Sequence, residues 1–184
     1  MALLEIRKFP DPVLRKVSEP VEKFDEELRA LCQDMAETMY DEPGIGLAAP
    51  QVGVSLRLFI GDGTIFGFEL GTTVVFANPT VLSSEGEQEG EEGCLSFPGV
   101  FEKISRPEKC RVRAQDVVGS FFELDCEGLS ARAIFHEVDH LEARLMIDYL
   151  SPLKRQLVRK EAKKGYPNDP RRHRDDDDDE AEAG

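Results

Sequence analysis

The segment Ile134–Leu141, with the sequence IFHEVDHL, carries two of the chain's three histidines, four residues apart. The pattern from Leu129 onward is typical of an α-helix in which Ala133 shares one stripe with both His136 and His140. Because this stripe is apolar, we expect the histidines to face the protein core rather than solvent. The other elements should therefore pack around this central helix.

A second amphipathic helix is predicted near the N-terminus. After Phe24-Asp25, apolar residues recur at spacings of three and four until Pro43-Gly44 ends the pattern. These apolar residues are Leu28, Leu31, Met35 and Met39.

The remaining patterns predict strands. Alternating, β-branched or aromatic residues indicate four of them, at 56–60, 72–77, 109–115 and 121–126. The last two flank Val118-Gly119-Ser120 and are expected to form an antiparallel hairpin. Acids and glycines at 83–93 predict a loop. We therefore expect an α+β fold with mixed, mainly antiparallel strands.

The size and composition of the chain fit one domain. Its 184 residues, 40% of them hydrophobic, allow one hydrophobic core. No apolar run approaches the roughly 18 residues of a membrane span, so we expect a soluble protein without a membrane partner. Residues 1–13 lack the pattern of a secretion signal, and the four cysteines form no CxxC pair. We therefore expect a cytoplasmic protein with reduced thiols.

The charge is unevenly distributed at the C-terminus. The formal net charge is -14, and residues 175–184 contribute five Asp and two Glu to it, which predicts a disordered acidic tail. Residues 154–174 contain nine Lys and Arg and are interpreted as a solvated basic helix and linker, with a contact to RNA as the alternative. A site for specific DNA is not expected. The catalytic domain is predicted to span residues 1–153.

The two histidines and the glutamate between them form the pattern HExxH, which predicts a metal site. Residues i and i+4 of a helix are neighbours, so His136 and His140 can present their ring nitrogens to one ion. A catalytic divalent metal usually has a third protein ligand. From the residues alone, Glu161 and Cys94 are both candidates, and Cys94 can also be read as a core residue or a nucleophile.

Three motifs in order resemble the signatures of the peptide deformylases. They are GIGLAAPQ at 44–51, EGCLS at 92–96 and HEVDH at 136–140, and the similarity runs from about Ile6 to Leu153. The resemblance implies a metal-dependent hydrolase that removes the formyl group from the N-terminal formyl-methionine of new polypeptides. It also implies iron(II), although zinc, nickel or cobalt would suit the ligands. A ribosome contact through residues 154–174 would place such an enzyme near its substrates.

The resemblance also implies roles for individual residues. Cys94, His136 and His140 would bind the metal, and Glu137 would be the general acid and base. The side-chain amide of Gln51 and the backbone N–H of Leu95 would stabilise the oxyanion. Residues Gly44, Ile45 and Gly46 would bind the peptide backbone beside an apolar pocket for the methionine side chain. Arg106 would pair with Asp139 to anchor the metal helix.

Three positions depart from the family pattern. Phe135 replaces a common glutamine, Glu142-Ala143 replaces a segment that usually contains glycine, and Phe101 stands where some members have a basic residue. None of these changes removes a predicted ligand, so we expect activity. Two other hypotheses are a zincin-like peptidase that uses Glu161 and a non-catalytic, ribosome-associated binding protein.

Overall fold

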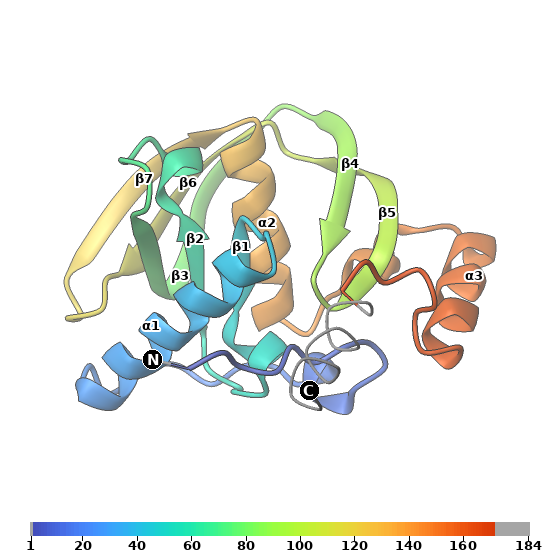
Figure 1. Ribbon diagram of the computed structural model, residues 1–184. Coiled ribbons are helices and arrows are strands. Elements are labelled where there is room, and N and C mark those ends of the chain that lie inside the picture. The colour runs from blue at the N-terminus through green and yellow to red at the C-terminus, as the bar shows by residue number, and fades with distance from the viewer. Residues whose placement is uncertain (1, 172–184) are drawn as a thin grey trace, which may run out of the picture.

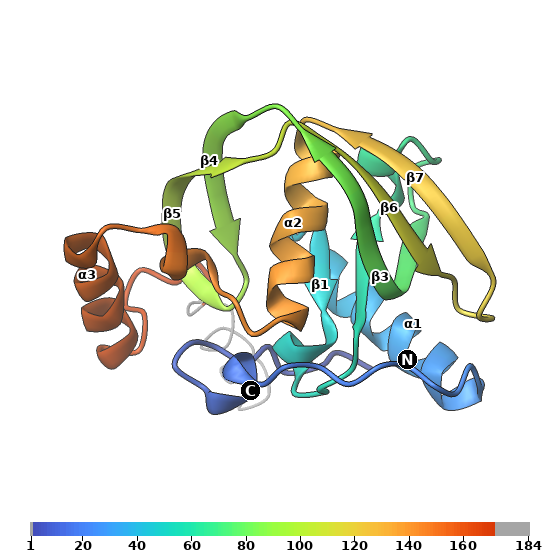
Figure 2. The same ribbon diagram turned by 180° about the vertical axis from the view of Figure 1, so that it is seen from behind.

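The computed structural model describes residues 2–171, so the predicted acidic tail lies outside the described residues. Figures 1 and 2 show a curved sheet, a separate hairpin and a helix between them. The helices are α1 (Glu26–Asp41), α2 (Leu129–Leu141) and α3 (Pro152–Lys163). The strands are β1 (Gly46–Ala48), β2 (Leu58–Asp62), β3 (Thr73–Glu85), β4 (Gln88–Cys94), β5 (Phe97–Arg106), β6 (Lys109–Gln115) and β7 (Phe121–Glu127). This arrangement confirms the predicted α+β class.

The strands form two antiparallel sheets. Five strands follow the order β1-β2-β3-β6-β7, and β4 pairs with β5 in a separate hairpin. The predicted hairpin at 109–126 is confirmed, with Cys110 opposite Cys126 in its register. The predicted strands at 56–60 and 72–77 correspond to β2 and to the first part of β3.

Helices α1 and α2 cover opposite faces of the five-stranded sheet. The side chains of β2 alternate between these faces: Leu58 and Ile60 join the core cluster under α1, whereas Phe59 joins the cluster under α2. Phe59 stacks on Phe76 of β3, with 4.5 Å between the ring centroids. The period-two alternation of the strand thus supplies both cores.

Helix α1 follows its sequence signals closely. The side chain of Asp25 caps the first turn by accepting a hydrogen bond from the N–H of Leu28 at 3.1 Å. The predicted apolar face is buried at Leu28, Met35 and Met39 and packs against the sheet. The N-terminal amphipathic helix is therefore confirmed.

The loop predicted at 83–93 is wrong. Strand β3 continues to Glu85, and most of the remaining residues lie in β4. The glycines of β4 have a low strand propensity, but they make space for side chains of neighbouring elements. A Cβ on Gly90 would lie 2.9 Å from Arg132 Nη2, and one on Gly93 would lie 2.6 Å from Cε1 of Phe101. Tertiary packing therefore overrides the local sequence signal.

Helix α2 ends in a turn that usually requires glycine. Ala143 has φ = 59°, and its N–H donates to His140 O while the N–H of Arg144 donates to Asp139 O. This pair of hydrogen bonds is a Schellman motif, whose left-handed residue is most often glycine. At the departure Glu142-Ala143 the helix therefore ends in a glycine-type turn, with alanine in a backbone conformation that disfavours a side chain.

Helix α3 lies at the side of the molecule beyond β5 (Figure 1). Its Val158 is buried in a third core cluster with Phe97, Ile104 and Leu150. The boundary predicted at Leu153 falls just inside α3, and the division of the chain into segments stays a prediction. Within residues 2–171, no helix is long and apolar enough to cross a membrane.

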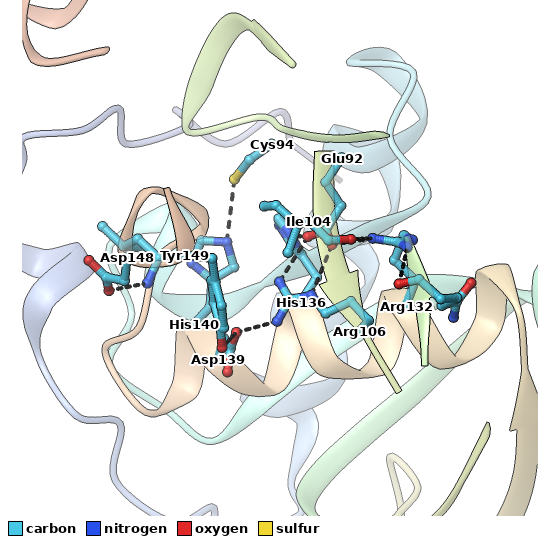
Figure 3. Close-up of polar contacts among 12 residues, drawn as sticks. Glu92, Cys94, Ile104, Arg106, Arg132, His136, Asp139, His140, Asp148 and Tyr149 are labelled. Atoms are coloured by element: carbon cyan, nitrogen blue, oxygen red, sulfur yellow. Dashed lines mark hydrogen bonds and ion pairs between the residues drawn. The ribbon is translucent and has the colours of Figure 1, made fainter. Parts of the chain in front are cut away.

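A buried charge network joins α2 to the β4–β5 hairpin (Figure 3). Arg106 of β5 donates two hydrogen bonds of 2.9 Å to Glu92 of β4 and one of 2.6 Å to Asp139 of α2. The Arg106–Asp139 pair expected from the sequence is thus confirmed. Arg132 adds a hydrogen bond of 2.8 Å to Glu92, and Tyr149 adds one of 2.6 Å to Asp139.

Replacing Arg106 by Met should destabilise the protein strongly. Arg106 is only 4% exposed, so its loss leaves the carboxylates of Glu92 and Asp139 with fewer counter-charges in a buried place. Breaking one partner of such a pair costs about 3–5 kcal/mol. Urea unfolding measures the free energy, with Arg111→Met on the exposed face of β6 as the control. A loss for Arg106→Met no greater than that of the control would contradict this account.

Candidate metal centre and cleft

The three predicted metal ligands meet at one point. Cys94 is the last residue of β4, and His136 and His140 lie one turn apart on α2. Their ligand atoms all lie within 4.8 Å of one another, and Cys94 Sγ is 3.4 Å from Nε2 of His140 (Figure 3). The structure therefore brings together residues 42 positions apart in the sequence, Cys94 and His136, in the manner the motifs predicted.

Glu92 fixes the orientation of one histidine. Its carboxylate lies 2.7 Å from Nδ1 of His136. Burial alone would raise the pKa of Glu92, but hydrogen bonds from Arg106 and His136 hold it well below its ordinary value. An ionised carboxylate only accepts, so Nδ1 carries the proton and Nε2 keeps a lone pair for a ligand.

Glu137 lies beside this cluster and is only 5% exposed. Burial raises the pKa of Glu137 to about 7, against the opposing effect of His136. Its Oε2 has no hydrogen-bond partner within the described protein. A Cβ on Gly46 would lie 2.6 Å from its Oε1, so β1 can approach Glu137 only because residue 46 is glycine.

Gln51 is a buried polar residue rather than an ordinary turn residue. It lies in a 3-10 helix (Ala49–Val52) and is 1% exposed. Its Oε1 accepts from the N–H of Ala48 at 3.0 Å. Its Nε2 donates to Ser96 Oγ at 3.1 Å and lies 3.5 Å from Cys94 Sγ. These bonds fix the amide donor next to the three ligands.

A cavity of about 430 Å³ opens beside the cluster. One wall is the segment Glu42–Gly46, which contains the three residues predicted to bind peptide, and another is formed by residues 93–101. Leu129 and Ala133 of α2 contribute apolar surface, and Phe101 is 62% exposed at the second wall. The cavity is mostly apolar and its lining includes the segment predicted to bind peptide, which suits a peptide substrate.

Some residues that line the cavity carry no recognisable signal in the sequence. Arg132 lies one turn before His136 and donates to Glu92, and Asp169 and Arg171 come from the chain after α3. Phe135, the first departure from the family pattern, packs against the core cluster under α2 instead of making a polar contact there. In the sequence, Arg132 stands out only as a charge in the predicted helix, and no motif marks it.

The donor set fits a divalent metal. One thiolate and two imidazoles can occupy three positions of a tetrahedral ion and leave the fourth for water. The buried Oε2 of Glu137 without a protein partner fits a site that holds such a water. Within residues 2–171, Glu161 does not belong to the group of side chains that can share an ion.

Comparisons with known proteins agree with this geometry. Residues 3–156 match the family model described as polypeptide deformylase. "Peptide deformylase 1" of Burkholderia multivorans is 50% identical over 165 residues, which cover 89% of this chain and 90% of that protein. The peptide deformylase of Afipia carboxidovorans is 54% identical over 161 residues, or 87% and 94% of the two chains.

Solved structures show the same fold. The crystal structure of a peptide deformylase from Legionella pneumophila has 48% identity and a TM-score of 0.83, and the match covers 89% of this chain and 95% of that one. The peptide deformylase of Ehrlichia chaffeensis in complex with actinonin has 37% identity and a TM-score of 0.84, covering 91% and 99%. With three motifs at one site and a matched family model, the chain belongs to the peptide deformylase family.

Proposed function

We propose that this protein removes the formyl group from N-formylmethionyl peptides and releases formate. The observation that carries the proposal is the meeting of Cys94, His136 and His140 beside Glu137, at a cavity that suits a peptide substrate. Membership in the family supports the same reaction. The substrate is a new polypeptide that still carries its formyl-methionine.

Cys94, His136 and His140 are proposed to hold one divalent ion. When bound, such an ion lowers the pKa of a water ligand to about 7 and polarises a carbonyl oxygen. Iron(II) is the ion we propose, on the basis of the family resemblance. The same ligands also suit zinc, nickel or cobalt, because imidazole and thiolate bind several divalent metals.

Glu137 is proposed to move the proton of the reaction. Hydrolysis adds water to the formyl carbon and breaks its bond to the methionine nitrogen, so a proton must travel from water to the departing amine. Glu137 lies next to the cluster, and its buried Oε2 is free of protein hydrogen bonds within the described residues. One carboxylate can therefore take the proton and then deliver it.

Gln51 and Leu95 are proposed to stabilise the oxyanion. The amide of Gln51 is held beside Cys94 Sγ by its bonds to Ala48 and Ser96. The N–H of Leu95 belongs to the peptide that follows the proposed ligand Cys94. Fixed donors of this kind lower a barrier because they need no reorientation during the reaction, and loss of one typically costs about 100- to 1,000-fold in rate.

Residues Gly44, Ile45 and Gly46 are proposed to bind the peptide backbone. Strand β1 is at the edge of the five-stranded sheet, so an extended peptide can add beside it. The methionine side chain would enter the apolar surface around Leu129 and Ala133. The exposed Phe101 would meet later residues of the substrate through an apolar contact.

The direct test is formate release from formyl-Met-Ala-Ser by iron-loaded protein prepared without oxygen. Glu137→Gln should lower kcat by about 100-fold or more, because it removes the acid and base but keeps the shape. Glu161→Gln on α3 is the matched control and should leave kcat unchanged. No formate from the metal-loaded parent would refute the proposed reaction, and a loss in Glu161→Gln as large as that in Glu137→Gln would favour the zincin-like hypothesis, in which Glu161 is a metal ligand.

We also propose that the protein works in the cytoplasm and contacts the ribosome through its basic segment. Arg159, Lys160 and Lys163 of α3 are exposed, and a cluster of such side chains can bind RNA phosphates. Their positions on a helix at the side of the molecule leave the cleft open to a nascent chain.

Changing Arg159, Lys160 and Lys163 together to Glu should abolish salt-sensitive co-sedimentation with ribosomes. The residues are exposed, so the fold and formate release should be unaffected. Three lysine-to-glutamate changes on other exposed positions, Lys16, Lys23 and Lys103, form a control with a matched charge. Equal binding by parent and variant would exclude α3 as the contact.

A further inference from the structure

The chain after α3 returns to the cleft. Residues 166–171, which we name the return segment, lie beyond residue 156, where the match to the family model ends. Figure 1 shows this stretch running back from α3 toward the lower ends of β4 and β5. Three of its residues, Asp169, Pro170 and Arg171, line the cavity beside the metal cluster.

The return segment is anchored at several points. The buried Tyr166 donates a hydrogen bond of 2.7 Å to the carbonyl of Phe9. Asp169 is 4% exposed and accepts from Lys8 Nζ at 3.2 Å. A Cβ on Gly99 would lie 2.9 Å from the carbonyl oxygen of Asn168, so the backbones pack closely there. The segment is therefore part of the folded protein rather than a loose extension.

Arg171 joins three parts of the cleft. Its Nη1 donates to Glu42 Oε2 at 3.0 Å, and its Nη2 donates to the carbonyl of Leu95 at 3.3 Å. Its Nε donates to Asp169 Oδ1 at 3.0 Å. The planar guanidinium can hold all three acceptors in fixed directions, which an ammonium group cannot do as well.

These contacts span the two walls of the cleft. Glu42 begins the first wall, whose other end, Gly46, lies against Glu137. Leu95 belongs to the second wall, and its Cδ1 would lie 3.0 Å from a Cβ on Gly44. Arg171 thus bridges the walls at Glu42, the opposite end of the first wall from Gly46, which lies against Glu137. Substrate residues after the methionine would pass this point.

We propose that Arg171 is a positioning residue that sets the width of the cleft for the second and third residues of the peptide. This inference rests on the proposed function. Arg171 acts through Glu42 and Leu95, because its own donors are directed at protein acceptors. Its effect should therefore depend on the length of the substrate and not on the chemistry of the formyl group.

The test compares a short and a long substrate, formyl-Met amide and formyl-Met-Ala-Ser. Arg171→Gln should raise the KM of the longer substrate about 10-fold, the size of one lost charged hydrogen bond, and change kcat less than 2-fold. The KM of formyl-Met amide should stay within 2-fold of the parent. Arg171→Lys should recover part of the effect, because it keeps the charge near Glu42.

Further variants isolate the bridge. Glu42→Gln combined with Arg171→Gln should raise KM no more than the larger single change, because both remove the same link. Arg29→Gln on the exposed first turn of α1 is the control. A chain that ends at Arg171 should behave as the parent, which separates the bridge from the residues beyond it. Urea unfolding and metal content are measured for every variant.

Each result decides between the hypotheses. The inference would be overturned by equal changes in KM for both substrates, or by a loss of metal and stability that does not depend on substrate length. Either result would show that Arg171 only holds the return segment in place. An unchanged KM in folded Arg171→Gln would also overturn it. If the parent itself releases no formate from either substrate, the proposed function fails. This result differs from that of an active parent whose KM is unaffected by Arg171→Gln.

Discussion

The proposed metal centre depends on the contacts that the carboxylate of Glu92 makes with α2 and β5. This carboxylate accepts hydrogen bonds from Arg106 and Arg132 and lies 2.7 Å from Nδ1 of His136. A buried carboxylate needs such partners, because an unpaired charge in the interior is very unfavourable. Since Glu92 lies on β4 and His136 on α2, satisfying this one charge also fixes the hairpin against the helix.

The placement of the proposed ligands follows from this contact between the β4–β5 hairpin and α2. Cys94 comes two residues after Glu92 at the end of β4, so a hairpin held by Glu92 carries its thiol to α2. The helix is itself positioned by its packing on the five-stranded sheet, with Ala131 and Ile134 in the core beneath it. Helix α2 therefore has two faces with different neighbours: a polar face toward the hairpin and an apolar face toward the sheet. The geometry of the centre needs both contacts.

Much of the fold could be predicted from local patterns. The cap at Asp25 and the alternation at 109–115 act within a few residues, so α1 and the hairpin of β6 and β7 were readable from the sequence. The strand at 88–94 was not, because its glycines are explained by tertiary neighbours, Arg132 of α2 and Phe101 of the paired strand. A local pattern carries no information about such partners.

The candidate site was likewise predictable from the sequence only in part. Spacing on a helix predicted the two histidines, and the family motifs selected Cys94 over Glu161. The role of Glu92 as the shared acceptor and the approach of Arg171 to the cleft depend on contacts across the fold. Gln51 shows the intermediate case, since its motif marked it but only the structure shows the bonds to Ala48 and Ser96 that hold its amide.

X-ray absorption spectroscopy of the zinc-loaded protein tests the central claim, that Cys94, His136 and His140 form one metal centre. The account predicts one sulfur at about 2.3 Å and two imidazole nitrogens at about 2.0–2.1 Å, with the sulfur signal absent from Cys94→Ser. A zinc shell of nitrogen and oxygen alone in the parent would contradict it, because the thiol at the end of β4 would then lie outside the centre.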